Sequence, residues 1–232
     1  MMRIIHEWKH VALLAALAVG AVSEPLSVHW SERIRVVAVL IGVLIYIGVL
    51  LVIYERRWER VLGFFLSTFA LIASIHHEVS PLPSQAGAIA YHCLASLFFT
   101  FAVIVILQRI FQRKIIRTDD VIGALCGYLL AGAAWGNVYA LVYLISPASY
   151  RIADAIAAQL GNWHLQRFLF DYFSIMTLTT QGFGDIAPAG SPVYSLMLAE
   201  SVFGQFYIAV VVAQLVGLRL AQAIKPDRPD AP

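Results

Sequence analysis

Charged residues are scarce in this chain. They account for 13% of its 232 residues, whereas ordinary soluble domains contain about 25%. Hydrophobic residues account for 60%, and the mean hydropathy is +0.78. This composition excludes an ordinary soluble domain and predicts a membrane protein, whose surroundings are the lipid bilayer. The net charge of +2 is too small to indicate nucleic-acid binding.

Cysteine is also scarce. Cys93 and Cys126 both lie inside apolar stretches, so neither a disulfide framework nor a zinc site is indicated. The sequence has no phosphate-binding glycine loop, no cluster of metal ligands and no nucleophile beside a base. We therefore expect no enzyme, no organic cofactor and no small-molecule substrate other than ions.

Long apolar runs are abundant. A helix that crosses a bilayer needs about 20 residues, and the lower limit is about 17. Four runs are long enough: 34–54, 84–107, 121–145 and 192–220. A fifth run, 61–75, is short but can be completed by the residues that flank it. The first run, 10–22, fits either a retained span or a cleaved signal peptide. The pattern predicts an all-α membrane protein with six transmembrane helices.

Basic residues fall mainly in alternate loops. If six segments cross, twelve of the 16 lie on one side: Arg3, Lys9, Arg56, Arg57, Arg60, Arg109, Arg113, Lys114, Arg117, Arg219, Lys225 and Arg228. The side of a membrane that carries the excess of Lys and Arg is the cytoplasmic side. We therefore predict a multi-pass protein of the plasma membrane with both termini in the cytoplasm.

The first four spans do not form a voltage sensor. A sensor helix carries a basic residue at about every third position within the membrane, and the run 84–107 has none. Residues 1–108 are predicted to form a four-helix bundle without sensor charges, and 109–120 a basic cytoplasmic linker. Arg109, Arg113 and Arg117 recur every fourth residue, which fits a helix on anionic lipid or a hinge.

A short polar segment interrupts the apolar pattern near the end of the chain. The apolar run 168–178 is too short to cross, and it leads directly into Thr179–Asp185. Non-helical backbone at membrane depth persists only where it is buried in protein or lines a water-filled cavity. Gly182 and Gly184 allow backbone conformations in which successive carbonyls face the same way. A helix aimed inward and followed by such a strand is typical of an ion-selectivity filter.

The motif itself resembles a known signature. "TLTTQGFGD", residues 177–185, resembles the potassium channel signature T-x-T-T-V-G-[YF]-G-D and differs from it only at Gln181. "GQFYIAVVVAQLVG", residues 204–217, is similar to the inner helix of two-helix channel pore domains, with Gly204 near the position of the hinge glycine. The resemblance extends over residues 119–222.

The resemblance implies a domain layout. Residues 121–222 would form a pore domain with a re-entrant pore helix, followed by a disordered tail at 223–232. Its parts would be an outer helix (121–145), a turret (146–164), a pore helix (165–178), a filter (179–185) and an inner helix (192–220). Because one such strand encloses no pore, four chains around an axis are implied, so the protein would be a homotetramer.

The resemblance also implies roles for individual residues. Thr180 would offer its carbonyl and hydroxyl to the innermost K⁺. Gln181, Gly182 and Phe183 would contribute backbone carbonyls above it, and Gly184 would complete the outer turn of the ion-coordinating segment. K⁺, the permeant ion, is the only cofactor implied.

Other residues would support the filter. Asp185, Tyr172 and Phe173 would brace it from behind, and a hydrogen bond from the Tyr172 hydroxyl to Asp185 is expected. Thr177 and Thr179 flank the filter on its pore-helix side. These residues would hold the carbonyls in place without touching the ion.

Gln181 leaves the function open. The usual aliphatic residue packs behind the filter, whereas a buried amide without partners costs about 1–3 kcal/mol. Thr177 and a trapped water are candidate partners. Three interpretations follow: a potassium-selective channel, a weakly selective monovalent cation channel, and a non-conducting membrane scaffold.

Two residues of the inner helix have alternative interpretations. Glu200 lies four residues before Gly204, where a charge is costly. It could attract cations or sense protons as a polar modulator, or it could hydrogen-bond to the pore helix. Gly204 could act as a gating hinge, or it could permit close packing against Gly127, Ala131 and Ala134 of the outer helix.

The absence of basic residues from the span 84–107 predicts indifference to voltage. We expect the open probability to change only shallowly between about −100 and +100 mV, since each moving charge contributes about 2.3 kcal/mol per 100 mV. Single-channel recording in planar bilayers measures this directly. A steep, saturating activation curve worth several elementary charges would contradict the prediction.

Overall fold

The protein is represented by a computed structural model that describes residues 2–27, 32–53, 57–79, 84–158 and 160–224. Most of the tail predicted at 223–232 lies outside these residues. The elements are α1 (Met2–Ser27), α2 (Glu32–Ile53), α3 (Arg57–Val79), α4 (Gln85–Gln112), α5 (Thr118–Ile145), a 3₁₀ turn (Pro147–Ser149), β1 (Tyr150–Ile152), α6 (Asp154–Ala157), α7 (Trp163–Leu178), β2 (Ile186–Pro188) and α8 (Ser191–Ile224).

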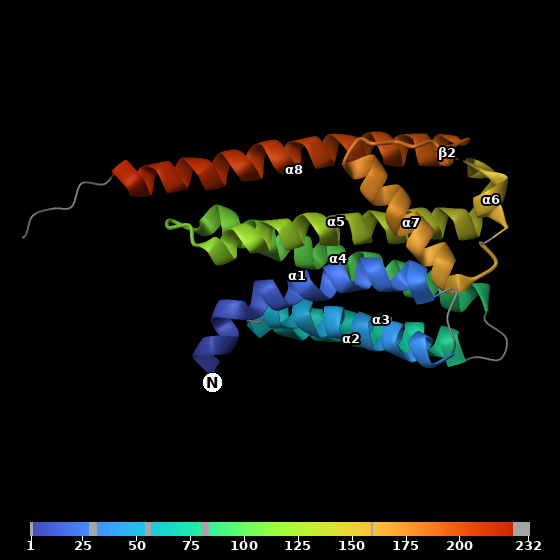
Figure 1. Ribbon diagram of the computed structural model, residues 1–232, viewed down its shortest axis with the longest axis horizontal. Coiled ribbons are helices and arrows are strands. Elements are labelled where there is room, and N and C mark those ends of the chain that lie inside the picture. Colours follow the sequence, from blue (N-terminus) through green and yellow to red (C-terminus); the bar gives the residue numbers. More distant parts are fainter. Residues whose placement is uncertain (1, 28–31, 54–56, 80–83, 159, 225–232) are drawn as a thin grey trace, which may run out of the picture.

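The six long helices run side by side along the long axis of the molecule, and α7 crosses them obliquely (Figure 1). Helix α8 ends at the same end of the molecule at which α1 begins. In the part of the chain that the structure describes, four helices are long and apolar enough to cross a membrane: Arg57–Ile75, Gln85–Gln112, Thr118–Ile145 and Ser191–Gln222. Within the described residues, α1 and α2 contribute shorter apolar stretches, Lys9–Ser23 and Leu40–Val52.

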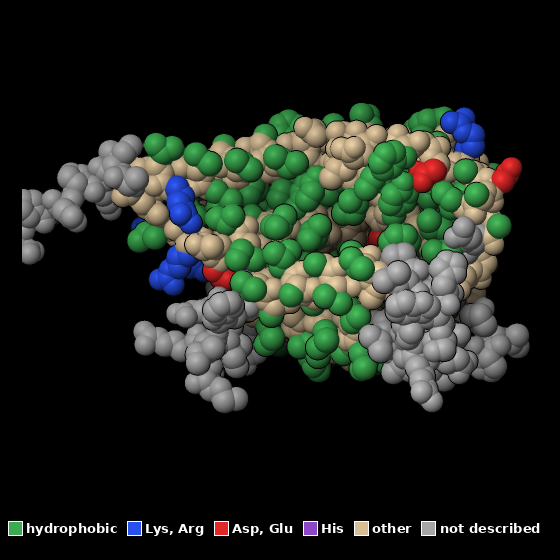
Figure 2. Space-filling model, viewed as in Figure 1, with side chains coloured by type: hydrophobic (Ala, Val, Ile, Leu, Met, Phe, Trp, Pro, Cys, Tyr) green, Lys and Arg blue, Asp and Glu red, His purple; other side chains and the backbone are tan. Residues whose placement is uncertain are grey.

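Apolar side chains are spread along the middle of the face drawn in Figure 2, and the charged side chains on it gather mainly at its two ends. This distribution matches the apolar middle and polar borders of a bilayer. The prediction of a helical membrane protein is confirmed, while the number of six spans stays a prediction.

The connection between α4 and α5 is shorter than the sequence suggests. Helix α4 continues to Gln112, and α5 begins at Thr118, so only residues 113–117 lie between them. The Asp120 carboxylate accepts a hydrogen bond from the Arg117 backbone N–H (2.8 Å) and so caps α5. The helix expected to carry Arg109, Arg113 and Arg117 on a lipid surface is therefore not formed.

Arg109 and Arg113 instead make contacts between helices, within the bundle and to α5 respectively. Arg109 donates to Glu59 of α3 (2.8 Å) and to the Val52 carbonyl of α2, and Arg113 pairs with Asp120 (3.2 Å). His10 of α1 lies 2.6 Å from Asp119, at the start of α5.

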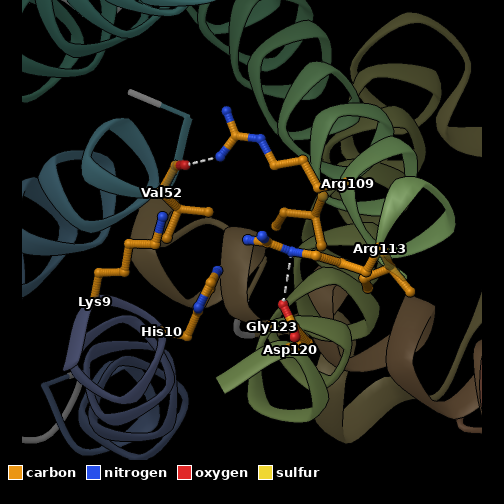
Figure 3. A pocket seen from close by; sticks show the side chains of 9 residues that line it. Lys9, His10, Val52, Arg109, Arg113, Asp120 and Gly123 are labelled. Atoms are coloured by element: carbon orange, nitrogen blue, oxygen red, sulfur yellow. Dashed lines mark hydrogen bonds and ion pairs between the residues drawn. The ribbon is translucent and has the colours of Figure 1, made fainter. Parts of the chain in front are cut away.

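Arg109, Arg113 and Asp120, together with Lys9 and His10, line the small cavity drawn in Figure 3. Its volume of about 20 Å³ holds no more than a single water molecule. We therefore interpret this cluster as a structural joint between helices.

Helix α5 carries a groove of two glycines that receives α7. Gly132 and Gly136 form a G-x-x-x-G pattern, which lets two helices approach closely within a membrane. A Cβ atom on Gly136 would lie 2.9 Å from the Cα atom of Asp171, and one on Gly132 would overlap the side chain of Ile175. At Gly136, where the neighbour is backbone, only glycine therefore permits the observed contact between α5 and α7.

Gly136→Ala is expected to destabilise the protein by about 1–3 kcal/mol, because the added methyl group overpacks the contact with Asp171. The change is measured as a lower midpoint of thermal unfolding in detergent. Gly42→Ala in α2 is the matched control, since a Cβ atom there meets nothing within 4 Å. Equal midpoints for the two variants would contradict the close approach.

Candidate functional site

Helix α7 enters the molecule from the α6 end and stops beside the middle of α8 (Figure 1). Its 16 residues span roughly 24 Å, which is less than the bilayer core of about 30 Å. After Leu178 the chain turns and returns along α8 to β2. The helix begins at Trp163, two residues before the predicted start of the pore helix.

The backbone of the returning segment has an alternating conformation. The φ angles are positive at Thr180 (59°), Gly182 (54°) and Gly184 (79°), with Gln181 and Phe183 between them. Thr180 is the only residue other than glycine with a positive φ in the part of the chain that the structure describes. The left-handed conformation costs a non-glycine residue roughly 1–2 kcal/mol, so the surrounding structure must hold Thr180 in place.

Hydrogen bonds to the end of α7 fix the direction of the carbonyls. The N–H groups of Gln181 (2.8 Å) and Gly182 (3.3 Å) both donate to the Met176 carbonyl, and that of Thr180 donates to Thr177 (3.0 Å). In a trans peptide unit the C=O points opposite to the N–H of the following residue. The carbonyls of Thr179, Thr180 and Gln181 therefore point away from the end of α7.

The outer end of the segment is held separately. The Tyr172 hydroxyl donates to Asp185 Oδ2 (2.9 Å), which is the hydrogen bond expected from the sequence. The other carboxylate oxygen of Asp185 accepts from the Ile186 N–H (2.9 Å). Phe173 is buried and packs edge-on against Tyr139 of α5, with 4.8 Å between ring centroids.

The threonines beside the filter bond to their own helix. Thr177 Oγ1 donates to the Phe173 carbonyl (2.9 Å), and Thr179 Oγ1 donates to the Ile175 carbonyl (2.6 Å). The expected contact between Thr177 and Gln181 is absent from the hydrogen bonds of the described residues, and Gln181 is exposed in the single chain. The amide is therefore not buried within the single chain.

A small sheet in the turret was not anticipated. Strand β1 pairs antiparallel with β2, and Arg151 lies opposite Ala187. The buried Tyr150 hydroxyl donates to the Tyr139 carbonyl of α5 (2.8 Å), and burial raises the pKa of Tyr150, which keeps the hydroxyl protonated. The sheet and this tyrosine attach the chain after the filter to the outer helix. Strands of three residues are too short to give a periodic sequence signal.

Gly204 lies against the pore helix and not against the outer helix. A Cβ atom on Gly204 would lie 2.5 Å from the Leu178 carbonyl oxygen, which also accepts a hydrogen bond from Tyr128 of α5 (3.1 Å). Gly127 of the outer helix faces Tyr207 instead, whose hydroxyl donates to the Ala124 carbonyl (2.7 Å). The predicted packing contact thus has a different partner, and α8 is one continuous helix through Gly204.

Glu200 is fully buried and connects three helices. Its carboxyl group contacts the Tyr139 hydroxyl of α5 (2.6 Å) and the Ser174 hydroxyl of α7 (2.5 Å). The interpretation that Glu200 bonds to the pore helix is therefore correct as regards its contacts. Sequence reasoning missed Ser174 and Tyr139, because nothing in their local pattern distinguishes them from other core residues.

The N-terminal bundle also reaches the pore helix. Arg167 of α7 donates to the Tyr91 hydroxyl of α4 (3.2 Å), and the Tyr91 ring packs edge-on against Trp163, with 5.6 Å between centroids. Asp171 lies one turn after Arg167 and interacts electrostatically with it. The start of the pore helix is thus held by α4 as well as by α5.

Comparison with known proteins identifies the C-terminal part of the chain. Residues 137–218 match a family model described as an ion channel. The match begins within α5 and includes α7, the returning segment and most of α8. The same comparisons find no match among curated proteins and none among solved structures. The match supports an ion-channel function, and it covers about a third of the chain.

Gly204→Ala tests the contact with Leu178. An added methyl group would displace the end of α7 by overpacking, which costs about 1–3 kcal/mol, and would lower the thermal midpoint in detergent. Gly217→Ala in the same helix is the control, because a Cβ atom there meets nothing within 4 Å. A Gly204→Ala midpoint equal to that of the control would reject the contact.

Proposed function

We propose that the chain forms a homotetrameric, potassium-selective channel, which conducts K⁺ passively across the plasma membrane. One observation carries the proposal: a re-entrant helix is followed by a segment with positive φ at every second residue. In this segment the N–H groups of Gln181 and Gly182 are bonded to α7, which leaves the carbonyls free for a permeant ion. The ion-channel match over the same residues supports it.

Four chains are needed because one chain leaves the filter uncovered. Residues 180–184 are exposed, and Phe183 retains 69% of its accessible surface. Non-helical backbone at membrane depth is tolerated only when protein or a water-filled cavity covers it. Apolar residues of α8, among them Leu198, Val202 and Phe206, are exposed as well. Copies of the chain around an axis would cover both surfaces and enclose the carbonyls.

Within this proposal the residues take the roles that the resemblance implies. Thr180 offers its carbonyl and hydroxyl to the innermost K⁺, and Gln181, Gly182 and Phe183 supply carbonyls above it. Gly184 completes the outer turn. Both termini lie in the cytoplasm, because twelve of the 16 basic residues fall on that side if six segments cross.

Gln181 is the observation that favours the second candidate, a weakly selective monovalent cation channel. A polar side chain stands where an aliphatic one packs behind the filter, and a poorly packed filter would admit ions of other sizes. A non-conducting scaffold is the third candidate, since the contacts that build the pore could also serve assembly alone.

Reversal potentials of the purified protein in bilayers distinguish the three candidates. Under a tenfold K⁺ gradient balanced by Na⁺, an ideally K⁺-selective pore reverses at about 59 mV in magnitude. Gln181→Val should keep that value, or bring a smaller parent value closer to it, because it restores an aliphatic side chain behind the carbonyls.

Each other result identifies an alternative. A reversal potential near zero in the parent, with selectivity gained in Gln181→Val, establishes the weakly selective channel. No current from an intact parent tetramer establishes the scaffold. Gly182→Ala is the control for a disrupted filter. The φ angle of +54° at residue 182 strains a residue with a side chain, so the current should be lost while the tetramer persists.

A further inference from the structure

A buried cluster of oxygen atoms lies behind the filter, where α5, α7 and α8 meet. Glu200 and Ser174 are each fully buried, and so is Tyr139. The two oxygens of Glu200 contact different helices: Oε2 lies 2.6 Å from the Tyr139 hydroxyl, and Oε1 lies 2.5 Å from Ser174 Oγ. Ser174 Oγ also lies 2.8 Å from the Gly132 carbonyl oxygen.

The number of protons in this cluster can be counted. There are three oxygen–oxygen contacts, and each needs one proton between its two atoms to be attractive. Tyr139 supplies one proton and Ser174 supplies one, since a hydroxyl group has a single hydrogen. Ser174 cannot donate to Gly132 and to Glu200 together. An ionised Glu200 therefore leaves one contact without a proton, whereas a neutral carboxylic acid donates to Ser174 and completes all three.

We propose that Glu200 is a proton-binding site and a positioning residue: in its neutral form it completes the hydrogen-bond chain Tyr139–Glu200–Ser174–Gly132 and holds the pore helix between α5 and α8. Loss of the proton leaves a buried charge and breaks one link of the chain. Ser174 precedes Leu178 by one helical turn, so the broken link loosens the helix end from which the filter begins. The filter geometry is therefore proton-dependent, and the effect on conduction rests on the proposed function.

Few other titratable groups face Glu200. Helix α5 presents Tyr139 and Tyr128, the second of which interacts with Glu200 electrostatically. The side chain that α7 presents to the carboxyl group is Ser174, which does not titrate. The charged residues of α7, Arg167 and Asp171, interact with each other.

Infrared spectroscopy of the purified protein in liposomes tests the proton directly and needs no current. A neutral carboxylic acid has a carbonyl stretch distinct from that of a carboxylate. We expect this band in the parent at neutral pH, its absence in Glu200→Gln, and its loss from the parent at high pH. Identical spectra for parent and variant at neutral pH would overturn the proposal.

Conduction provides the second measurement. Above the pH at which half of the Glu200 side chains are neutral, the neutral fraction falls about tenfold per pH unit. The parent current should therefore fall towards high pH. Glu200→Gln should remove this dependence, because an amide donates to Ser174 and accepts from Tyr139 as the neutral acid does. An unchanged pH profile in Glu200→Gln would overturn the proposal. An infrared band without any current would support the proton site and reject the channel.

Ser174→Ala is the matched variant if Glu200→Gln does not give a tetramer. It keeps the acid and removes one partner, so the carbonyl band of Glu200 should shift in position. A band that is unaffected by Ser174→Ala would show that another acid produces it, and the proposal would fail.

Discussion

The position of the pore helix is the constraint on which the rest of the structure depends. Helix α7 ends inside the molecule, and its last carbonyl groups have no partner within their own helix. The Met176 carbonyl is satisfied by the returning backbone, and the Leu178 carbonyl by Tyr128. These bonds require that α5 and α8 approach α7 closely, which Gly136 and Gly204 make possible. The segment 179–185 that follows α7 thus inherits its position from helix packing.

The same constraint explains how the bundle relates to the pore domain. Arg167 places a charge on the face of α7 that lies against α4, and Tyr91 accepts a hydrogen bond from it. At the opposite end of the molecule, His10 and Asp119 join α1 to the start of α5. Each of these contacts loses its hydrogen bond if the helices shift, so the two contacts favour the observed arrangement of the helices. The first four helices are therefore attached to the C-terminal helices near both ends of the molecule.

The filter segment is strained and restrained at both ends. Thr180 adopts a conformation that L-residues avoid, and backbone bonds to α7 keep it there. Beyond Gly184, Asp185 bonds to Tyr172, and the pairing of β1 with β2 holds the exit. A segment fixed at its two ends can present carbonyls in a set direction. The cluster around Glu200 contacts α7 at Ser174, one turn before the first of these two ends.

The sequence by itself determined the membrane class, the last four long helices and the place of the turn after α7, because run length and local motif depend only on neighbouring residues. The assignment of residues 179–185 as a filter stays a prediction. It also predicted the bond from Tyr172 to Asp185, 13 residues away. Only the tertiary structure decided the contacts of Glu200, whose partners lie 26 and 61 residues away, and the partner of Gly204. Such contacts depend on which helix faces pack together. The periodic pattern of a helix indicates that one face is apolar, but it does not indicate which other helix covers that face.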